Sequence, residues 1–564
     1  MITGPRGADH GTTQADHGTT PRADHGVAPV DHDQPEVVIV GGGHNSLVAA
    51  AYLARAGRRV VLLEAADRLG GAVASGYPFP GVDARLSRFS YLVSLLPQRL
   101  VDELGLDLEL ASRTIGSYTP VGDRGLLIER TPGRATDASF TAWSAADHAA
   151  WPAFESRLAT FAALLAPTLM DPLPRAADLR ARVEPELWRS LVERPIGELV
   201  EDTFVDDAVR GLVLTDALIG THARAHDPSL RQNRCFLYHV IGNGTGEWKV
   251  PVGGMGRVAA ELVRVATEAG ADLRTGRRVT ALRPADGGGG TVTLADGSTL
   301  RAPHVLVGCA PTALPGLVAA SAQRPAGSQT KINVMLARLP RFRSGIDPAT
   351  GFTGTLHLAQ GYARLDEAWA EAAAGSLPDP LPVEAYCHSL TDPTILGPRL
   401  RASGAHTLTL FALHTPAGLF TDHPDGSRAE VGAAALRSLQ AVLDEPLEDC
   451  LARDTDGRPC VEVLTPLDVE AELSMPGGHI FHGDLSWPWL PEGSEPAGAA
   501  ERWGVATAHP GVLLCGSSAV RGGAVSGLGG HDAAMAVLEE AAAAGDFTHP
   551  AAFGSVSPRA PLAQ

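Results

Sequence analysis

The sequence predicts an α/β protein in which a Rossmann-type, nucleotide-binding domain is interleaved with a second domain of mixed sheet and helices. Two stretches carry this prediction. The apolar residues Val37–Val40 run directly into Gly41–Gly42–Gly43 and a helical pattern of small residues, which is the order strand, tight turn, helix. A second apolar strand pattern then ends at Glu64, 21 positions after Gly43. A carboxylate about 20 residues after the glycines is typical of dinucleotide-binding folds, where it binds the ribose.

The glycine turn has the chemistry that a pyrophosphate group requires. Gly41 permits the sharp exit from the strand, and Gly43 has no Cβ, so that an anion can approach the backbone. The following helix begins with His44, Asn45 and Ser46, and its amide groups and positive dipole end can hold the anion; the dipole contributes roughly 0.3–1 kcal/mol. Ser46 stands where Gly or Ala is usual, but it is small enough for close packing. A βαβ unit that binds nothing is the disfavoured alternative.

Composition excludes several other classes of function. The chain has 564 residues, enough for two domains with large cores, and a net charge of −18, which disfavours nucleic acid and anionic membrane surfaces as partners. Six scattered cysteines without a CxxC pair argue against a disulfide framework, a redox dithiol and a zinc site, and no metal site is expected. No apolar run is long enough to span a bilayer, and no signal peptide is evident. We therefore expect a cytoplasmic protein; membrane association could arise from a local patch, but the sequence does not indicate one.

The run after Glu64 indicates which nucleotide is bound. It reads Ala65–Ala66–Asp67–Arg68–Leu69–Gly70–Gly71–Ala72 and resembles the phytoene desaturase/amine oxidase group of flavoproteins. This resemblance implies FAD as the cofactor, with Arg68, Gly70, Gly71 and Ala72 as cofactor contacts, because in that group the Gly-Gly backbone runs along the FAD pyrophosphate. Amine oxidases usually carry Arg directly after the Gly-Gly pair, so Ala72 favours the desaturase side of the group.

The resemblance extends from Pro35 to about Ala543. It is to the phytoene desaturase-like FAD oxidoreductases, in the branch of the pyridine nucleotide-disulfide oxidoreductase domain-containing protein 2. Its most specific parts are the segments 41–45, 253–256, 477–483 and 522–530. It implies that Val279 contacts the adenine through its backbone. The glycines at 241–246 are not followed by a helical pattern, so no NADPH domain is expected.

A third segment returns to the cofactor near the C-terminus. An apolar strand pattern ends at Gly516, and a glycine-rich turn then opens a long Ala-rich helix. A helix N-terminus beside the flavin pyrimidine would stabilise the negative charge that gathers there on reduction. Gly516, Ser526 and Gly527 are therefore expected cofactor contacts. The alternative is a flexible loop before a surface helix.

Candidate catalytic residues lie just ahead of this segment. His482 and Asp484 are two positions apart, so on an extended strand both would face the same side, where they could move protons or orient the substrate. Arg521 stands with Val520 where the resembling branch usually carries a His-Pro pair, and it could bind a substrate carboxylate or the reduced flavin. The alternative for His482 is a structural histidine.

Together these features predict an FAD-dependent oxidoreductase that dehydrogenates, or in reverse saturates, a C–C bond in a largely apolar small molecule. The resemblance implies the acyclic polyene class. Two alternatives stay open: amine oxidase-type C–N oxidation, and a non-catalytic lipid- or prenyl-binding protein on the same fold, as in the Rab GDP-dissociation inhibitors. The sequence gives neither the direction of the reaction nor the electron acceptor, which could be oxygen, a quinone or another protein.

The predicted domain organisation follows from these segments and from the patterns between them. The FAD-binding domain comprises 35–106, 246–320 and 466–545, a helical substrate or cap region spans 107–245, and a sheet-rich substrate domain spans 321–465. Apolar residues at helical spacing from Trp143 to Leu165 support the cap, and strand patterns at 332–336 and 407–411 support the sheet. A low-complexity tail is expected at 1–34, where the low content of apolar residues around Ala-Asp-His-Gly repeats favours disorder over metal binding, and a C-terminal tail at 546–564.

Overall fold

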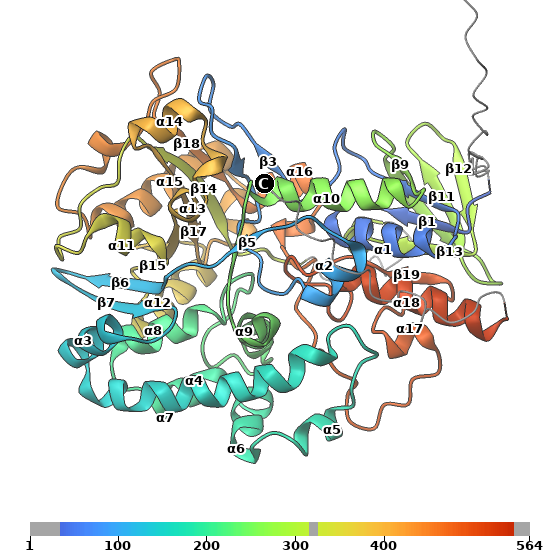
Figure 1. The fold of residues 1–564 in the computed structure, drawn as a ribbon, viewed down its shortest axis with the longest axis horizontal. Coiled ribbons are helices and arrows are strands. Elements are labelled where there is room, and N and C mark those ends of the chain that lie inside the picture. Colours follow the sequence, from blue (N-terminus) through green and yellow to red (C-terminus); the bar gives the residue numbers. More distant parts are fainter. Residues whose placement is uncertain (1–33, 315–324, 546–564) are drawn as a thin grey trace, which may run out of the picture. The chain divides into compact units, whose positions relative to one another are not determined.

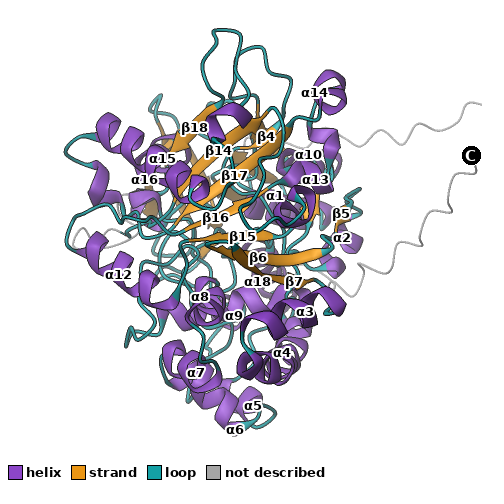
Figure 2. Ribbon diagram, turned by 90° about the vertical axis from the view of Figure 1, so that its left-hand side faces the viewer, coloured by secondary structure: helices purple, strands orange, loops and turns teal. Residues whose placement is uncertain are grey.

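The computed structural model describes residues 34–314 and 325–545. The two predicted tails therefore lie outside the described residues, apart from Gln34. Figures 1 and 2 show two mutually perpendicular views of the chain.

The nucleotide domain is built on a parallel sheet of five strands. Its order is β19 (Val512–Leu514), β13 (His304–Val307), β1 (Val37–Val40), β2 (Val60–Leu63) and β9 (Asp272–Arg274). All residues of β1 and β2 are buried, as their unbroken apolar runs predict for a parallel sheet covered on both faces. The strand–turn–helix order predicted around the glycines is thus confirmed.

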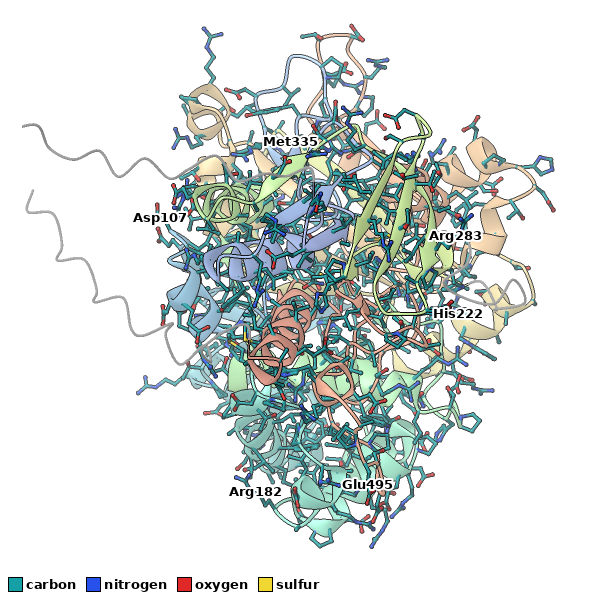
Figure 3. All side chains as sticks on the ribbon, turned by 90° about the vertical axis from the view of Figure 1, so that its right-hand side faces the viewer. Asp107, Arg182, His222, Arg283, Met335 and Glu495 are labelled. Atoms are coloured by element: carbon teal, nitrogen blue, oxygen red, sulfur yellow. The ribbon has the colours of Figure 1, made fainter. Side chains whose placement is uncertain are left out.

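Alternate residues of β1 face two different layers. Val37 and Ile39 pack with the helices α1 (His44–Arg55), α10 (Met255–Glu268) and α18 (Leu528–Ala543). Val38 and Val40 pack against an antiparallel sheet of β10 (Val279–Pro284), β11 (Gly290–Leu294) and β12 (Thr299–Ala302), in which β11 and β12 form a hairpin around Asp296–Gly297. Exposed charged side chains such as Asp107 and Arg283 project from this part of the chain in Figure 3.

The second sheet has seven strands. Its order is β18 (Val461–Leu464), β14 (Thr330–Leu336), β17 (His406–Ala412), β16 (Val383–Tyr386), β15 (Thr355–Leu358), β6 (Ile115–Val121) and β7 (Arg124–Glu129). Only the β15–β6 pair is parallel, so the predicted mixed sheet is confirmed. The region 107–245 is not helical throughout, because β6 and β7 form a hairpin around Gly122–Asp123 and complete this sheet.

A block of helices lies beside β6, β7 and β15 (Figure 2). It consists of α3 (Arg134–Trp143), α4 (Ala145–Leu165), α5 (Ala176–Arg180), α6 (Pro185–Trp188), α7 (Ile196–Thr203), α8 (Asp207–Thr215) and α9 (Arg231–Ile241). The expected helical stripe is confirmed: Phe154, Leu158 and Leu165 are buried along α4. In the part of the chain that the structure describes, no helix is long and apolar enough to cross a membrane.

The remaining strands and α-helices complete the described chain. They are β3 (Ser75–Gly76), β4 (Leu86–Ser87), β5 (Leu110–Ala111), β8 (Val250–Pro251), α2 (Gln98–Leu104), α11 (Pro348–Thr353), α12 (Tyr362–Ala373), α13 (His388–Thr391), α14 (Pro398–Ser403), α15 (Pro424–Gln440), α16 (Pro466–Leu473) and α17 (Ala499–Arg502).

Candidate active site

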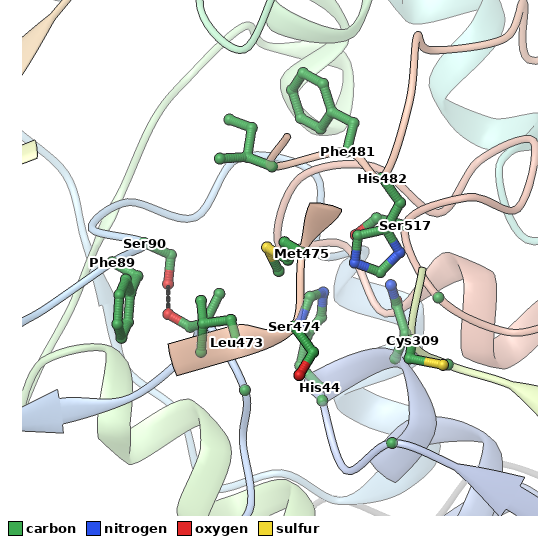
Figure 4. A pocket seen from close by; sticks show the side chains of 18 of the residues that line it. His44, Phe89, Ser90, Cys309, Leu473, Ser474, Met475, Phe481, His482 and Ser517 are labelled. Carbon is green, nitrogen blue, oxygen red and sulfur yellow. Dashed lines mark hydrogen bonds between the residues drawn. The ribbon is translucent and has the colours of Figure 1, made fainter. Parts of the chain in front are cut away.

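A cavity of about 560 Å³ lies at the N-terminal end of α1 and reaches the second sheet. Its wall combines the glycine turn, the end of β2, residues of β14 and β17, and the segments 472–485 and 516–525. Residues far apart in sequence therefore meet around one space. Figure 4 shows part of this wall, with His44, Cys309, His482 and Ser517 gathered at one end.

The glycine turn forms an open cradle. Gly41 has φ +94°, which the left-handed turn out of β1 requires, and a Cβ there would stand 3.2 Å from the backbone nitrogen of Cys309. A Cβ built on Gly43 meets no atom within 4 Å, because this glycine faces the cavity. A methyl group at Gly43 would therefore occupy cavity space and not displace protein atoms.

The start of α1 is suited to an anion. No side chain caps the helix at Gly43, and its first turn holds no acidic residue, so the positive dipole end faces the cavity uncompensated. His44 Nε2, Asn45 Oδ1 and Ser46 Oγ are buried without a hydrogen-bond partner among the described residues. Asn45 Nδ2 donates to the carbonyl oxygen of Gly522 at 3.0 Å, which ties the helix to the C-terminal segment.

Glu64 holds the turn from its position just after β2. Its carboxylate accepts hydrogen bonds from the backbone N–H of Gly42 at 2.6 Å and of Ala66 at 2.7 Å. Each oxygen keeps a lone pair, and the side chain lines the cavity. The carboxylate can therefore accept hydroxyl groups of a ribose while it stays fixed by the backbone.

Most of the predicted cofactor contacts line this cavity. They are Gly41, Gly43, His44, Asn45, Ser46, Glu64, Arg68, Gly71, Ala72, Val279 and Gly516. Their individual contacts with the cofactor stay predictions.

Three predicted contacts, Gly70, Ser526 and Gly527, lie outside the cavity wall. Gly70, at φ +111°, donates its N–H to Gly42 and packs so closely that a Cβ would stand 2.8 Å from that of Ala259. The Ser526 hydroxyl accepts from the N–H of Leu528, and Gly527 begins α18 at φ +74°. These residues shape the turns, and Gly523, Ala524 and Val525 reach the cavity instead.

Lys331 is a cavity residue that the sequence reasoning missed. It lies in β14, whose seven residues are all buried, and its Nζ donates to the carbonyl oxygens of Ser87 and, at 2.8 Å, of Phe89. Burial lowers the pKa of this amine well below its usual value. The signal that could have identified it was a lysine directly before the apolar strand pattern at 332–336.

Two neutral histidines face the same space. Burial lowers the pKa of His44 to about 4 and that of His482 to about 3, so both imidazoles are uncharged at neutral pH. His482 has φ +63° and its buried Nδ1 has no partner within the described chain. A left-handed backbone at a residue other than glycine stores strain, and such strain is concentrated at functional sites. The role of His482 as a site residue stays a prediction.

The expectation that His482 and Asp484 share one face of a strand is wrong. Residues 479–484 form turns, with Gly477, Gly478 and His482 all at positive φ. Asp484 is exposed and outside the cavity wall, 3.8 Å from Arg231 and 4.0 Å from His479. Asp484 is therefore placed as a surface partner of these two side chains.

The expectation that Arg521 faces the cofactor or substrate is also wrong. The side chain is 1% exposed, does not line the cavity, and donates to the carbonyl oxygens of Leu169, Asp171 and Pro488. These bonds hold the helical block to the C-terminal segment, which is a structural role.

The site residues thus fit the parts of FAD: an open glycine cradle and a helix N-terminus for the pyrophosphate, and a fixed carboxylate for the ribose. Comparison with known proteins gives the same result. Residues 47–449 match the family of flavin-containing amine oxidoreductases. The chain belongs to this family.

Relatives of this flavin-containing chain include the uncharacterized protein Rv0897c of Mycobacterium tuberculosis, 48% identical over 530 residues, which cover 90% of this chain and 98% of that protein. Pyridine nucleotide-disulfide oxidoreductase domain-containing protein 2 of Mus musculus is 29% identical and covers 96% of this chain and 99% of its own length. Hydroxyneurosporene desaturase of Cereibacter sphaeroides is 28% identical over 297 residues, 50% of this chain and 57% of that protein. The resemblance to the desaturase-like branch is confirmed.

Solved structures support the fold. A putrescine oxidase variant has a TM-score of 0.54 at 17% identity and covers 91% of this chain and 99% of its own; cyclohexylamine oxidase from Brevibacterium oxydans has a TM-score of 0.50, also at 17% identity, and covers 90% and 99%. Family, relatives and fold together make this chain an FAD-dependent oxidoreductase.

Proposed function

We propose that the chain dehydrogenates, or in reverse saturates, a C–C bond of a largely apolar small molecule, with an acyclic polyene as the first candidate. The observation that carries this proposal is the apolar wall of the cavity away from the glycine turn, formed by Leu92, Leu95, Ile219, Phe411, Met475, Ile480, Phe481 and Leu485. Such a wall excludes water and binds a carbon chain without specific polar contacts. The bound flavin supplies a two-electron acceptor for hydride.

Dehydrogenation of a C–C bond releases a hydride from one carbon and a proton from its neighbour, and we propose that Lys331 accepts the proton. A neutral amine has two N–H bonds and one lone pair. The carbonyl oxygens of Ser87 and Phe89 take both N–H bonds, which leaves the lone pair free on a side chain that lines the cavity. Because burial lowers the pKa of Lys331, the neutral form is populated nearer to neutral pH, where a general base is effective.

His44 and His482 are proposed to orient the substrate. With pKa values of about 4 and 3, they are too weakly basic to remove a proton from carbon efficiently, but they keep the site uncharged and can donate or accept one hydrogen bond.

Anaerobic reduction of the flavin tests the proposal. Purified FAD-loaded protein is mixed without oxygen with three sets of compounds: polyenes, simple alkenes, each with its saturated counterpart, and primary amines. The loss of flavin absorbance is followed for each compound. Bleaching by a polyene or its saturated counterpart supports the proposal, and reoxidation by oxygen or a quinone then identifies the electron acceptor. Bleaching by amines alone would refute it.

Amine oxidation is the second candidate. The family match and the two solved amine oxidases favour it, and aromatic residues such as Phe411 and Tyr238 line the cavity. Against it stands Ala72 at the position after the Gly-Gly pair.

A further inference from the structure

A second cavity of about 250 Å³ adjoins the first, between the helical block and the strands β6, β15 and β16. Five residues line both cavities: Tyr91, Leu92, Ile219, His239 and Trp248. We call the second cavity the polar chamber and these five residues the neck. His239 and Trp248 stack in the neck with ring centroids 4.7 Å apart. The neck is thus a mostly apolar wall that the cofactor cavity and the chamber share.

Arg113 gives the chamber a cation with unused donors. It precedes β6, and Nη1 donates to Thr355 Oγ1 at 3.3 Å, while the guanidinium lies 5.8 Å from the ring centroid of Tyr386. Its side chain forms no ion pair with any carboxylate of the described chain. A guanidinium has five N–H donors, so Arg113 lines the chamber with most of its donors unused by the described residues.

Asp216 gives the chamber an acceptor with no partner. It follows α8 directly, is half-buried, and its carboxylate makes no hydrogen bond or ion pair within the residues that the structure describes. Burial raises its pKa. Glu384, 2% exposed, already accepts the Tyr386 hydroxyl, and burial raises its pKa to about 8, so Glu384 is largely uncharged at neutral pH.

These groups select the chemistry of a ligand. Arg113 and Asp216 both line the chamber, so side chains of opposite charge face one small space. The chamber wall also holds Glu129, Arg130, Glu155 and Glu247: Glu129 accepts from Thr136, Arg130 lies 3.9 Å from Glu247, and burial raises the pKa of Glu155. Beside the unpaired Arg113 and Asp216, a carboxylate ligand would be repelled by Asp216 and an ammonium ligand by Arg113, whereas a hydroxyl group can accept from Arg113 and donate to Asp216.

We propose that the polar chamber binds the hydroxyl-bearing end of the substrate, while its apolar chain passes along the neck into the cofactor cavity. This inference rests on the proposed function, because it names the polar end of the apolar substrate proposed there. The head group anchored at Arg113 and Asp216 would then fix which carbon atoms reach the reaction position.

A series of ten-carbon probes tests the chamber with the FAD-loaded protein. The probes are 1-decanol, decyl methyl ether, decanoate and decylammonium, and binding is measured by calorimetry. We expect 1-decanol to bind most tightly, because the ether accepts but cannot donate. R113M should weaken both alcohol and ether by about tenfold or more, and D216A should remove most of the difference between them. R157M and D366A are matched controls, since Arg157 pairs with Glu184 and Asp366 with Arg224, both at the surface outside the chamber.

The inference would be overturned if the wild-type protein bound decanoate or decylammonium more tightly than 1-decanol, or bound all four probes equally. This result does not depend on the folding of any variant. Binding is measured without turnover, so failure of the polyenes to bleach the flavin counts only against the proposed reaction, and absence of an alcohol preference only against the chamber.

Discussion

Alanine at Gly43 should separate the folding of the chain from the binding of its cofactor. Gly43 has φ −69° and ψ 169°, an extended conformation that alanine adopts readily, and its added Cβ meets no atom within 4 Å. A compatible Gly→Ala change stabilises a protein by about 0.4–1 kcal/mol, because the unfolded chain loses freedom. The FAD-free G43A protein should therefore be as stable as the parent or slightly more stable.

The same methyl group should weaken FAD binding. It would project into the cradle at the start of α1, where the pyrophosphate approaches the backbone. A hydrogen bond from a backbone N–H to a charged group contributes about 1.5–3 kcal/mol. Loss of one such bond corresponds to about tenfold to a hundredfold weaker binding.

Two measurements on FAD-free protein check this prediction: thermal unfolding by circular dichroism, and titration with FAD followed by quenching of flavin fluorescence. G418A is the matched control, because Gly418 is also open around its Cβ position but lies outside the cavity. Unchanged FAD affinity in G43A, or an FAD-free protein that melts well below the parent, would refute the reasoning.

Four further changes probe the rest of the site. E64Q should lower the free energy of unfolding by about 1–3 kcal/mol, because its amide cannot accept from both Gly42 and Ala66. Urea titration measures this free energy, and an unchanged value would contradict the prediction. K331M should retain FAD but reduce the flavin about a hundredfold more slowly in anaerobic stopped flow; a wild-type rate would exclude Lys331 as the base. Burial lowers the pKa of His482 from 6.5 to about 3, so its contribution to the free energy of unfolding is complete above pH 6.5 and falls by about 1.4 kcal/mol per pH unit below it. H482Q should therefore flatten the pH dependence of stability by that slope between pH 6.5 and 4, as measured by urea titration. An unchanged slope would contradict the assignment. R521M should lose at least about 2 kcal/mol of stability while folded protein keeps its FAD affinity, since three carbonyl oxygens lose their donor; weaker FAD binding without destabilisation would restore Arg521 to the site.

The cofactor end of the site could be predicted because its determinants are local. One contiguous run supplies strand, glycine turn and helix, and Glu64 directly follows the next strand, so spacing alone places these groups together. The predicted sheet strands 332–336 and 407–411 were likewise confirmed as parts of β14 and β17. Strand and turn signals are strongest where a short segment determines its own conformation.

The errors have equally local causes. Asp484 was misplaced because an extended strand was assumed across a segment in which Gly477, Gly478 and Gly483 all have positive φ, a turn that the Pro476–Gly477–Gly478 run already indicates. Arg521 carried no such signal, since its partners Leu169 and Pro488 lie far away in sequence.

The remaining half of the site is assembled only by the tertiary fold. Lys331 meets the carbonyl of Phe89 across 242 positions, and Arg113 meets Thr355 across the same number. The glycine turn therefore forms without Lys331 and Arg113, and we expect substitutions of these two residues to alter the substrate without disturbing FAD. On our proposal, the substrate of this chain is selected at Lys331, the neck and the polar chamber, not at the glycine turn.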